Sequence, residues 1–439
     1  MVTSIYILAD TIMVGQGVGD AGLAALTIFM PIVASFFALG LLLGVGGGVL
    51  MSVAKGSGNE SLAHKYFSTA MISAAVVSVC FAVFGAIFFD PMMYALGADT
   101  TNIELVRGYG LCYTVSAPLF IFSSSLQSFI RNDKSPRHAM IAVLTGSGLN
   151  ILLDYLFIFV FKMGMFGASF ATSIGTSITV CILIIHFFTK KNTMRFSFRF
   201  FSIKALWEIA KCGFSSFLIE CANAVLVFVF NHTLLKYIGS VGVTVYSIMS
   251  NVAVVCMSLF NGVTLAAQPI IATNHGADNH KRVLQVRHIG TITSSVIAVI
   301  IFCVGFFFPD LLIYSYVKDP TPEILELARY ALRIYFFAYL FMNFNIFFSG
   351  YFQSTLRPVA AITIQILRSL LLSSVLVSVL PMIFGADAIW YAVPITECIT
   401  FFVAMAFLFF GRFKKNKRSE IKKRKYRNGI CAFYIMEYE

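Results

Sequence analysis

Long apolar segments alternate with short polar turns along almost the whole chain of 439 residues. Eleven of these segments have about 20 residues or more, the length that an α-helix needs to cross a hydrocarbon core of about 30 Å. Membrane barrel strands would be about half as long, so the pattern predicts an all-α polytopic membrane protein. The predicted spans lie near residues 22–50, 66–89, 108–130, 138–161, 166–189, 206–235, 240–272, 289–308, 326–353, 359–384 and 388–410.

A further apolar segment at the start of the chain is shorter than the others. It runs from Thr3 to Val14 and at 1.5 Å per residue reaches about 18 Å, too little to cross a membrane. A secretory signal peptide is excluded because there is no basic region at the start and Asp10 interrupts the apolar run. We therefore expect a truncated first helix, which an upstream start of the gene would explain.

Lysine and arginine gather in alternate turns, which predicts how the chain is oriented. These turns should be cytoplasmic, because short cytoplasmic loops are enriched in basic residues. The basic set is Lys55, Lys65, Arg131, Lys134, Arg137, Lys190, Lys191, Arg195, Arg199, Lys204, Lys281, Arg282, Arg287 and Arg357. The opposite set is acidic: Asp20, Asp90, Asp99, Glu104, Asp310, Asp319, Glu323 and Asp387. We expect a multi-pass protein of the plasma membrane with a cytoplasmic C-terminus.

Composition supports the membrane assignment and narrows the function. Charged residues make up 12% of the chain and hydrophobic residues 59%. The net charge of +12 is concentrated between Arg412 and Arg427, a run expected to bind anionic lipid headgroups rather than nucleic acid. No phosphate-binding loop or nucleotide-binding domain is present, so an ion gradient is the expected energy source and no cofactor is expected.

The chain also repeats itself at a spacing near 220 residues. Gly44-Val45 recurs 218 residues later as Gly262-Val263, and Gln127-Ser128 recurs as Gln353-Ser354 after 226. The Ser135-Pro136 pair resembles Arg357-Pro358 at 222. Such a spacing separates two sets of six spans, and because six is even both sets enter the membrane in the same sense. The repeat predicts two parallel six-helix bundles with a substrate cavity at their centre.

The domain boundaries follow from this repeat. We expect an N-terminal bundle over residues 1–195, with the partial first helix and helices two to six, and a C-terminal bundle over 206–411 with helices seven to twelve. The polar stretch from Lys190 to Lys204 would connect them, with a cytoplasmic linker at 196–205. Residues 412–439 would form a basic cytoplasmic tail.

One carboxylate lies deep within an apolar run. Asp154 falls between Leu149 and Phe161, with Asn150 one helical turn before it. A carboxylate at membrane depth costs a few kcal/mol or more and normally faces a bundle interior or a cavity. Asp154 is therefore predicted to bind a coupling ion or substrate, although a hydrogen bond that only packs two helices is the alternative.

Several motifs together resemble one transporter family. They are Ala9-Asp10-Thr11-Ile12-Met13-Val14-Gly15, Asn150-x-x-x-Asp154, Gly167-Ala168 with Ala171-Thr172, and Gln268-Pro269-Ile270-Ile271 with Asn274 and Gly276. In this order, and over nearly the whole chain, they look like a multidrug and toxic compound extrusion (MATE) transporter. The resemblance implies twelve helices in two lobes and export of organic cations or other amphiphiles in exchange for Na⁺ or H⁺. The outer course of the family's first helix, with its proline, has no counterpart before Asp10.

The resemblance also implies an ion site at Asp10, Asn150, Asp154 and Thr172. Residues four apart share a helix face, so Asn150 and Asp154 can act together, with Thr172 on the next helix. Carboxylate, amide and hydroxyl oxygens suit a hard cation such as Na⁺. Two nearby carboxylates in a medium of low dielectric can equally take up a proton. The residue types leave Na⁺ and H⁺ both open, and no other metal is expected.

The second half of the chain contains candidates for substrate binding. Glu220 and Glu397 lie at membrane depth, and Phe217 and Phe228 could stack on a lipophilic cation near Glu220. Pro269 should kink its helix, and with Gln268 it is a candidate gate. Ordinary packing explains each of these residues as well.

Three other functions compete with a drug exporter. A flippase for lipid-linked oligosaccharides or polysaccharides would need a wide basic cavity, whereas mostly acids lie at membrane depth here. A non-transporting sensor or an inactive, decayed transporter is a further alternative. No arrangement of histidine, serine or lysine indicates an enzyme. The expected protein is a monomer, and its expected partners are small amphiphilic or cationic molecules and membrane lipids.

Overall fold

The computed structural model describes residues 2–317 and 320–427, and every regular element in these residues is a helix. The all-α prediction is confirmed. The predicted tail lies partly in the last helix, and its residues 428–439 lie outside the described residues. The elements are α1 (Val2–Gly17), α2 (Asp20–Gly56), α3 (Glu60–Ile87), α4 (Phe89–Ala95), α5 (Ile103–Val115), α6 (Ala117–Asn132), α7 (Pro136–Tyr155), η1 (Leu156–Val160), α8 (Gly164–Ile185), η2 (His186–Phe188), η3 (Phe198–Phe200), α9 (Ile203–Tyr237), α10 (Ser240–Gly276), α11 (His280–Phe307), α12 (Pro309–Tyr316), α13 (Pro322–Phe336), α14 (Tyr339–Ser354), α15 (Pro358–Ile366), η4 (Leu367–Leu371), α16 (Leu372–Phe384), η5 (Ala386–Tyr391) and α17 (Ala392–Arg427).

The helices long and apolar enough to cross a membrane agree with the predicted spans. Within the described residues there are nine such helices, and two bent pairs raise the number to 11. The first pair, α5 and α6, bends by 52° next to Pro118, which lacks the N–H that would continue the helix. The second pair, α13 and α14, bends by 45°. Helix α1 has 16 residues and does not reach the length of a span.

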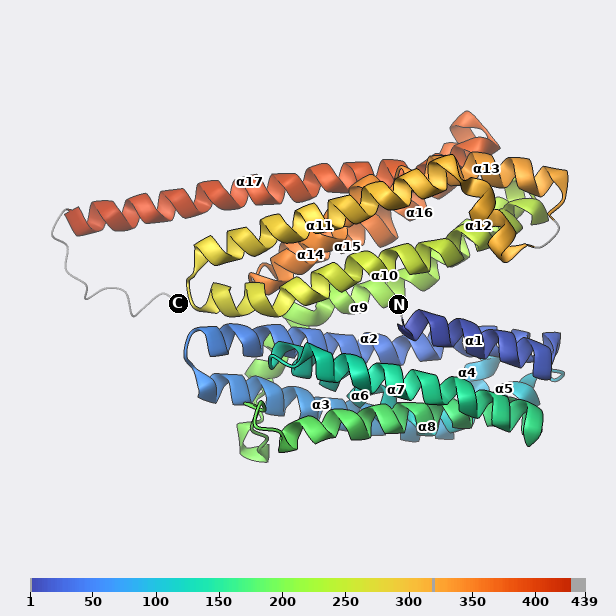
Figure 1. Ribbon diagram of the computed structural model, residues 1–439, viewed down its shortest axis with the longest axis horizontal. Helices are drawn as coiled ribbons and strands as arrows, with labels where there is room; N and C mark the ends of the chain where they lie inside the picture. Colours follow the sequence, from blue (N-terminus) through green and yellow to red (C-terminus); the bar gives the residue numbers. More distant parts are fainter. Residues whose placement is uncertain (1, 318–319, 428–439) are drawn as a thin grey trace.

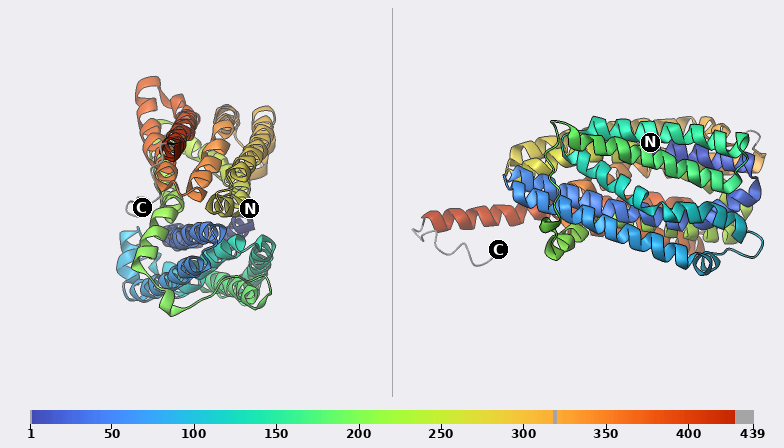
Figure 2. Two further views of the ribbon diagram at one scale, coloured as in Figure 1. Left: turned by 90° about the vertical axis from the view of Figure 1, so that its left-hand side faces the viewer. Right: turned by 90° about the horizontal axis from the view of Figure 1, so that it is seen from below.

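The helices form two lobes that lie against each other along their length (Figure 1). Helices α1–α8 make the N-terminal lobe and α9–α17 the C-terminal lobe, in the lower and upper halves of Figure 1. Residues 189–202 join the lobes, and Figure 2 shows this green segment crossing from one lobe to the other at one end of the bundle. This connection overlaps the linker expected at 196–205 and begins earlier.

The internal repeat appears in the helix boundaries at an offset of 220. Helices α2 and α10 have 37 residues each, α3 and α11 have 28 each, and the starts of both pairs differ by 220. Both long helices are preceded by a glycine in the left-handed region, Gly19 at φ 87° and Gly239 at φ 85°. Other residues rarely adopt this conformation. The repeat therefore extends to the turns, and α1 corresponds to the last part of α9, which has 35 residues.

The structure refines the register of the sequence matches. Pro136 and Pro358, 222 residues apart, each begin a helix, so that match is confirmed. The match at 218 is two residues from the offset of 220 between α2 and α10. Gln127 and Gln353, 226 apart, differ by about one helical turn from the offset of 222, so they share a face but are not equivalent positions. The predicted repeat is correct, whereas two of its local alignments are shifted.

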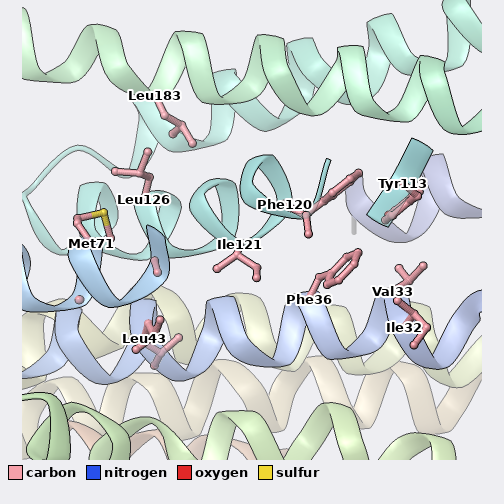
Figure 3. Close-up of a cluster of buried hydrophobic side chains, with 14 of the residues drawn as sticks. Ile32, Val33, Phe36, Leu43, Met71, Tyr113, Phe120, Ile121, Leu126 and Leu183 are labelled. Atoms are coloured by element: carbon pink, nitrogen blue, oxygen red, sulfur yellow. The ribbon is translucent and has the colours of Figure 1, made fainter. Parts of the chain in front are cut away.

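The core of the N-terminal lobe is built around α2 (Figure 3). Phe36 lies between Phe81 and Phe120, with ring centroids 5.0 and 6.2 Å away. Tyr113 stacks on Phe120 at 4.2 Å across the bend between α5 and α6. Rings from four helices therefore close this side of the lobe, and offset or edge contacts of this kind add to the burial of their surface.

The lobes touch most closely through glycines of α2, α9 and α10. A Cβ atom on Gly213 would lie 1.9 Å from the Leu42 oxygen. One on Gly276 would lie 2.0 Å from the Val53 oxygen, and one on Gly56 would lie 2.0 Å from the Thr273 oxygen. Any larger residue would push the backbones apart. The ends of α2 and α10 near their basic turns are thus in direct backbone contact, and we call this end of the molecule the basic end.

Candidate ion and substrate sites

Asp154 lies in the last turn of α7 and its exposed fraction is 0%. A π-helical turn, η1, follows directly and places an extra residue in the helix. Helix α7 packs against α8 and α1, so the carboxylate is enclosed by three helices of the N-terminal lobe. The burial expected from the sequence is present, and it comes from neighbouring helices.

Asn150 and Thr172 meet between α7 and α8. The Asn150 Nδ2 atom donates a hydrogen bond to Thr172 Oγ1 over 3.3 Å. The Thr172 hydroxyl in turn donates to the Ala168 oxygen one turn earlier, over 3.0 Å. This arrangement leaves the Asn150 Oδ1 atom without a hydrogen-bond partner in the described part of the chain. An amide oxygen is therefore available beside Asp154.

Asp10 completes this group from α1. Its exposed fraction is 5%, and its carboxylate interacts electrostatically with that of Asp154. Neither Asp154 oxygen, nor Asp10 Oδ1, has a hydrogen-bond partner among the described residues. Buried polar atoms in proteins are nearly always paired, so four unpaired oxygens in one place call for an explanation. A bound cation or proton would satisfy them, and no other part of the described chain gathers two buried acids in this way.

A small polar cavity adjoins Asn150 and Thr172. Its volume is about 50 Å³, enough for one or two water molecules, and Gln127 and Ser123 of α6 line it from the opposite side. The cavity is too small for a drug-sized molecule, which needs a pocket of about 300 Å³ or more. The N-terminal site therefore suits an ion with water, and not a large substrate.

A larger cavity lies in the C-terminal lobe, against α2. Its volume is about 420 Å³, and Leu41 and Val45 of α2 form the wall that belongs to the other lobe. Glu220, Gln268 and Arg368 line the remaining walls. Glu220 is half-buried and has no ion pair within the described residues. The predicted carboxylate is thus in a cavity of the right size for a small organic molecule.

Glu397 is buried behind this cavity and is paired. Its Oε1 atom accepts hydrogen bonds from Arg368 Nε at 3.0 Å and Nη2 at 2.8 Å. Its Oε2 atom accepts one from Asn345 at 2.7 Å. The sequence analysis proposed Glu397 as a free charge for a cationic substrate, but its charge is balanced within the protein. Arg368, which the sequence showed as an isolated base at membrane depth, is the residue that reaches the cavity.

The two phenylalanines proposed for substrate binding lie elsewhere on α9. Phe228 is 71% exposed and stacks on His232, and Phe217 stacks on Phe214. Neither ring lines the cavity. The helical period explains this, because residues 216 and 220 face the cavity one turn apart whereas 217 and 228 point along other directions. The structure does not bring these rings to the Glu220 carboxylate.

Gln268 links three helices at the base of the cavity. Its Nε2 atom donates to Gln353 Oε1 of α14 at 3.1 Å, and Gln353 Nε2 donates to the Cys212 oxygen and Ser216 of α9. Helix α10 continues through Pro269 to Gly276 without a break. The gate assigned to this pair stays a prediction, and the observed role of Gln268 is a bridge.

A buried charged group at the basic end was missed in the sequence. The Asp133 carboxylate accepts from Lys55 Nζ at 2.5 Å, from His186 Nε2 at 2.9 Å and from the Thr193 N–H at 3.0 Å, and also from the Thr193 hydroxyl. Burial by itself raises the pKa of Asp133, but the donors outweigh it and hold the pKa below the ordinary value. Asp133 directly follows the apolar span of α6, and this position was its only signal.

Comparisons with known proteins agree with this geometry. The sequence profile of the family described as MatE matches residues 1–156 and 212–379. The multidrug export protein MepA of Staphylococcus haemolyticus (strain JCSC1435) is 26% identical over 407 residues, which cover 92% of this chain and 89% of that protein. MepA of Staphylococcus saprophyticus is also 26% identical, over 94% of this chain and 91% of its own length.

Solved structures with the same fold are available. One is the outward-facing conformation of a multidrug resistance MATE family transporter of the MOP superfamily, with a TM-score of 0.88 and 21% identity, covering 95% of this chain and 93% of that one. Another is a MATE protein in complex with MaL6, with a TM-score of 0.87 and 21% identity, covering 95% and 94%. At these identities the similarity concerns the fold.

Proposed function

Since the chain belongs to the MATE family, whose members are transporters and not enzymes, we propose that it exports lipophilic organic cations in exchange for H⁺ or Na⁺. In this proposal the N-terminal lobe binds the coupling ion and the C-terminal cavity binds the substrate. The relatives named multidrug export proteins support export as the direction of transport. The protein would work in the plasma membrane with its basic end in the cytoplasm.

The unpaired oxygens around Asp154 carry the proposal. Two carboxylates, from Asp10 and Asp154, face each other in a buried place together with the Asn150 oxygen. Such a group is stable when a proton or a hard cation neutralises the charges, and it becomes strained when the ion leaves. Binding of the ion can therefore bias the equilibrium between two conformations, which is what coupling requires.

The cavity beside Glu220 supports a cationic substrate. Arg368 and Glu397 cancel each other's charge, so the Glu220 carboxylate is the unbalanced charge at the cavity wall. Apolar residues from α2 and α10, such as Val45 and Met257, share the lining with hydroxyl and amide groups. A lipophilic cation fits this combination of one negative charge with mixed walls. A pyrophosphate-linked sugar fits less well, because Arg368, the basic residue among the lining, is already paired.

Movement of the lobes would connect the two sites. In the structure the basic end is closed, because Gly56 and Gly276 lie against backbone oxygens of the other lobe. Release of substrate away from the basic end corresponds to this state. For uptake from the cytoplasm these glycine contacts must separate, so that the cavity beside Glu220 opens on the other side of the membrane.

Transport in everted vesicles tests this function. A fluorescent organic cation is followed while Na⁺ and H⁺ gradients are imposed in turn, for the unaltered chain and for Asp154→Asn. We expect one gradient to drive transport and Asp154→Asn to abolish it, with a smaller loss for Thr172→Ala. Asp90→Asn makes the same chemical change at an exposed carboxylate paired with Arg107 and should leave transport intact.

The outcomes separate the alternatives. Unchanged gradient-driven transport in Asp154→Asn would refute the ion site. Absence of transport in the unaltered chain, with folded protein in the membrane, would favour an inactive transporter or a sensor. Transport of a lipid-linked sugar in place of the cation would favour a flippase.

A further inference from the structure

The connection between the lobes exposes an unusual surface. It consists of residues 188–207, and we call it the linker surface. Phe198 is 76% exposed and Trp207 is 63% exposed, and Phe188 and Ile203 are exposed as well. Exposed basic side chains alternate with these apolar ones: Lys190, Lys191, Arg195, Arg199 and Lys204. Residues 189–202 of this surface lie between two spans, where apolar side chains are not needed to face hydrocarbon.

Hydrogen bonds hold the linker surface on the N-terminal lobe. Thr193 binds Asp133 through both its backbone N–H and its hydroxyl. The Ser197 N–H donates to Ser68 Oγ at 3.1 Å, and the Thr69 hydroxyl of α3 donates to the Phe200 oxygen at 3.3 Å. The segment is therefore a fixed element and not a loose tether. Its exposed rings do not fold back onto the protein, although fixed backbone would allow this, so they are available to an external partner.

We propose that the linker surface is a docking site for anionic phospholipid headgroups at the basic end of the molecule. Aromatic rings favour the boundary between hydrocarbon and headgroups, where one side is apolar and the other wet. Lysine and arginine beside them attract the phosphate of anionic lipids. The surface continues the membrane-facing belt, because Phe188 follows the exposed end of α8 and Trp207 lies in the first turns of α9.

The position of the rings favours a lipid over other anions. A nucleic acid or an acidic protein would meet the same basic residues, but the exposed rings point away from a lobe that already lies in the membrane. Lys211 lies over the Trp207 ring, with Nζ 5.2 Å from its centroid, so one amine and one ring already form a pair. A headgroup phosphate beside this pair would leave the ring at the depth that tryptophan prefers.

Tryptophan fluorescence can test this docking directly. The chain contains two tryptophans, and Trp390 is 1% exposed, so in Trp390→Phe the emission comes from Trp207. The protein is placed in vesicles of phosphatidylcholine in which either the phosphatidylcholine is brominated or brominated phosphatidylglycerol is added. We expect phosphatidylglycerol to quench Trp207 more strongly at equal mole fraction. A variant with Phe198→Trp, Trp207→Phe and Trp390→Phe reports in the same way on the middle of the linker.

Charge variants show whether the basic residues cause the preference. Lys204→Gln, read by Trp207, and Arg199→Gln, read by the tryptophan at position 198, should each lower the preference for phosphatidylglycerol by about five-fold. Lys281→Gln with Arg282→Gln removes two exposed charges from the turn between α10 and α11 and should change neither signal. High salt should reduce the preference in the unaltered linker.

Two results would overturn the proposal. One is equal quenching by the two lipids at both tryptophan positions. The other is a preference that falls as much in the Lys281 and Arg282 control as in the linker variants. A shift of emission on addition of an RNA oligonucleotide, together with equal lipid quenching, would assign the surface to nucleic acid. The measurement needs no transport, so its outcome does not depend on the proposed exporter being active.

Discussion

The cavities of the two lobes lie at equivalent places of the repeat but differ in chemistry. At an offset of 220 Phe37 of one cavity corresponds to Met257 of the other, and at 222 Gln127 corresponds to Ser349. At the same offset Gly146 corresponds to Arg368. The first cavity measures about 50 Å³ and the second about 420 Å³. One fold therefore provides a place for an ion in one lobe and for a larger molecule in the other.

A single pair of positions illustrates the difference. In the N-terminal lobe a Cβ atom on Gly146 would lie 2.6 Å from the Gly175 oxygen, so α7 and α8 touch through their backbones. At equivalent levels, to within one residue, the C-terminal lobe has Arg368 and Glu397, whose ion pair spans the gap between helices. Small residues let helices approach closely, and long side chains hold them apart. The size of these side chains is thus one reason why the cavities differ in volume.

The lobes also differ at the basic end. The N-terminal lobe has the buried Lys55–Asp133 pair, whereas the positions equivalent by the repeat are His275 and Thr355, neither of them acidic. The buried charge of the C-terminal lobe lies at membrane depth, at Arg368 and Glu397. Each lobe has one buried ion pair, and the two pairs stabilise different levels of the bundle.

Breaking the C-terminal pair should have the largest effect on stability. Glu397→Gln leaves the Arg368 charge buried without its partner, and we expect a loss of about 3–5 kcal/mol. Replacing both residues, as Arg368→Met with Glu397→Gln, should recover much of this loss because no unpaired charge remains. Denaturant unfolding of the purified variants measures both. Equal destabilisation by the single and double changes would contradict the assigned role of the pair.

Breaking the N-terminal pair should cost somewhat less and depend on pH. Asp133→Asn should lower the free energy of unfolding by about 3 kcal/mol, since Lys55 keeps some contact with solvent. The pKa of Asp133 is lowered in the folded protein, so its contribution is present above the ordinary carboxyl pKa and is lost as pH falls below it. The difference in Tm between the two proteins should therefore shrink below about pH 4. A constant difference at all pH values would exclude the charge as its cause.

Closing the gap between the small residues of the N-terminal lobe tests the packing difference. Gly146→Ala places a methyl group against Thr179 and the Gly175 backbone and should cost about 1–3 kcal/mol. Gly148→Ala lies on the same helix with open space around its Cβ and is the matched control. It should be neutral or slightly stabilising, because alanine favours helices. Similar thermal unfolding of the two variants would show that close approach at Gly146 is not needed.

The smallest effect is expected at the substrate cavity. Glu220→Gln keeps the shape of the side chain but removes its charge, and it should raise the apparent KM for an organic cation about ten-fold, since a charge-assisted contact contributes about 1.5 kcal/mol. The maximal rate of gradient-driven transport should change little. Initial rates in vesicles over a range of substrate concentrations separate the two. A loss of rate at unchanged KM would instead place Glu220 in the coupling step.

The sequence by itself determined the number of spans, the repeat and the depth of Asp154. These properties depend on the length and apolar character of each segment, which the surrounding membrane selects whatever the neighbouring helices are. The pairing of prolines 136 and 358 likewise follows from local backbone chemistry. The placement of Asp10, Asn150 and Thr172 came from a family resemblance and required no knowledge of packing.

Only the tertiary structure decided which side chains meet. It paired Glu397 with Arg368, 29 residues away, turned Phe228 to the outside and gathered four donors around Asp133. It also closed the basic end through glycines of both lobes. These outcomes depend on the rotation of each helix about its axis and on the choice of neighbours. A pattern of apolar residues along a span leaves both undetermined, because in a membrane a span can be apolar on every face.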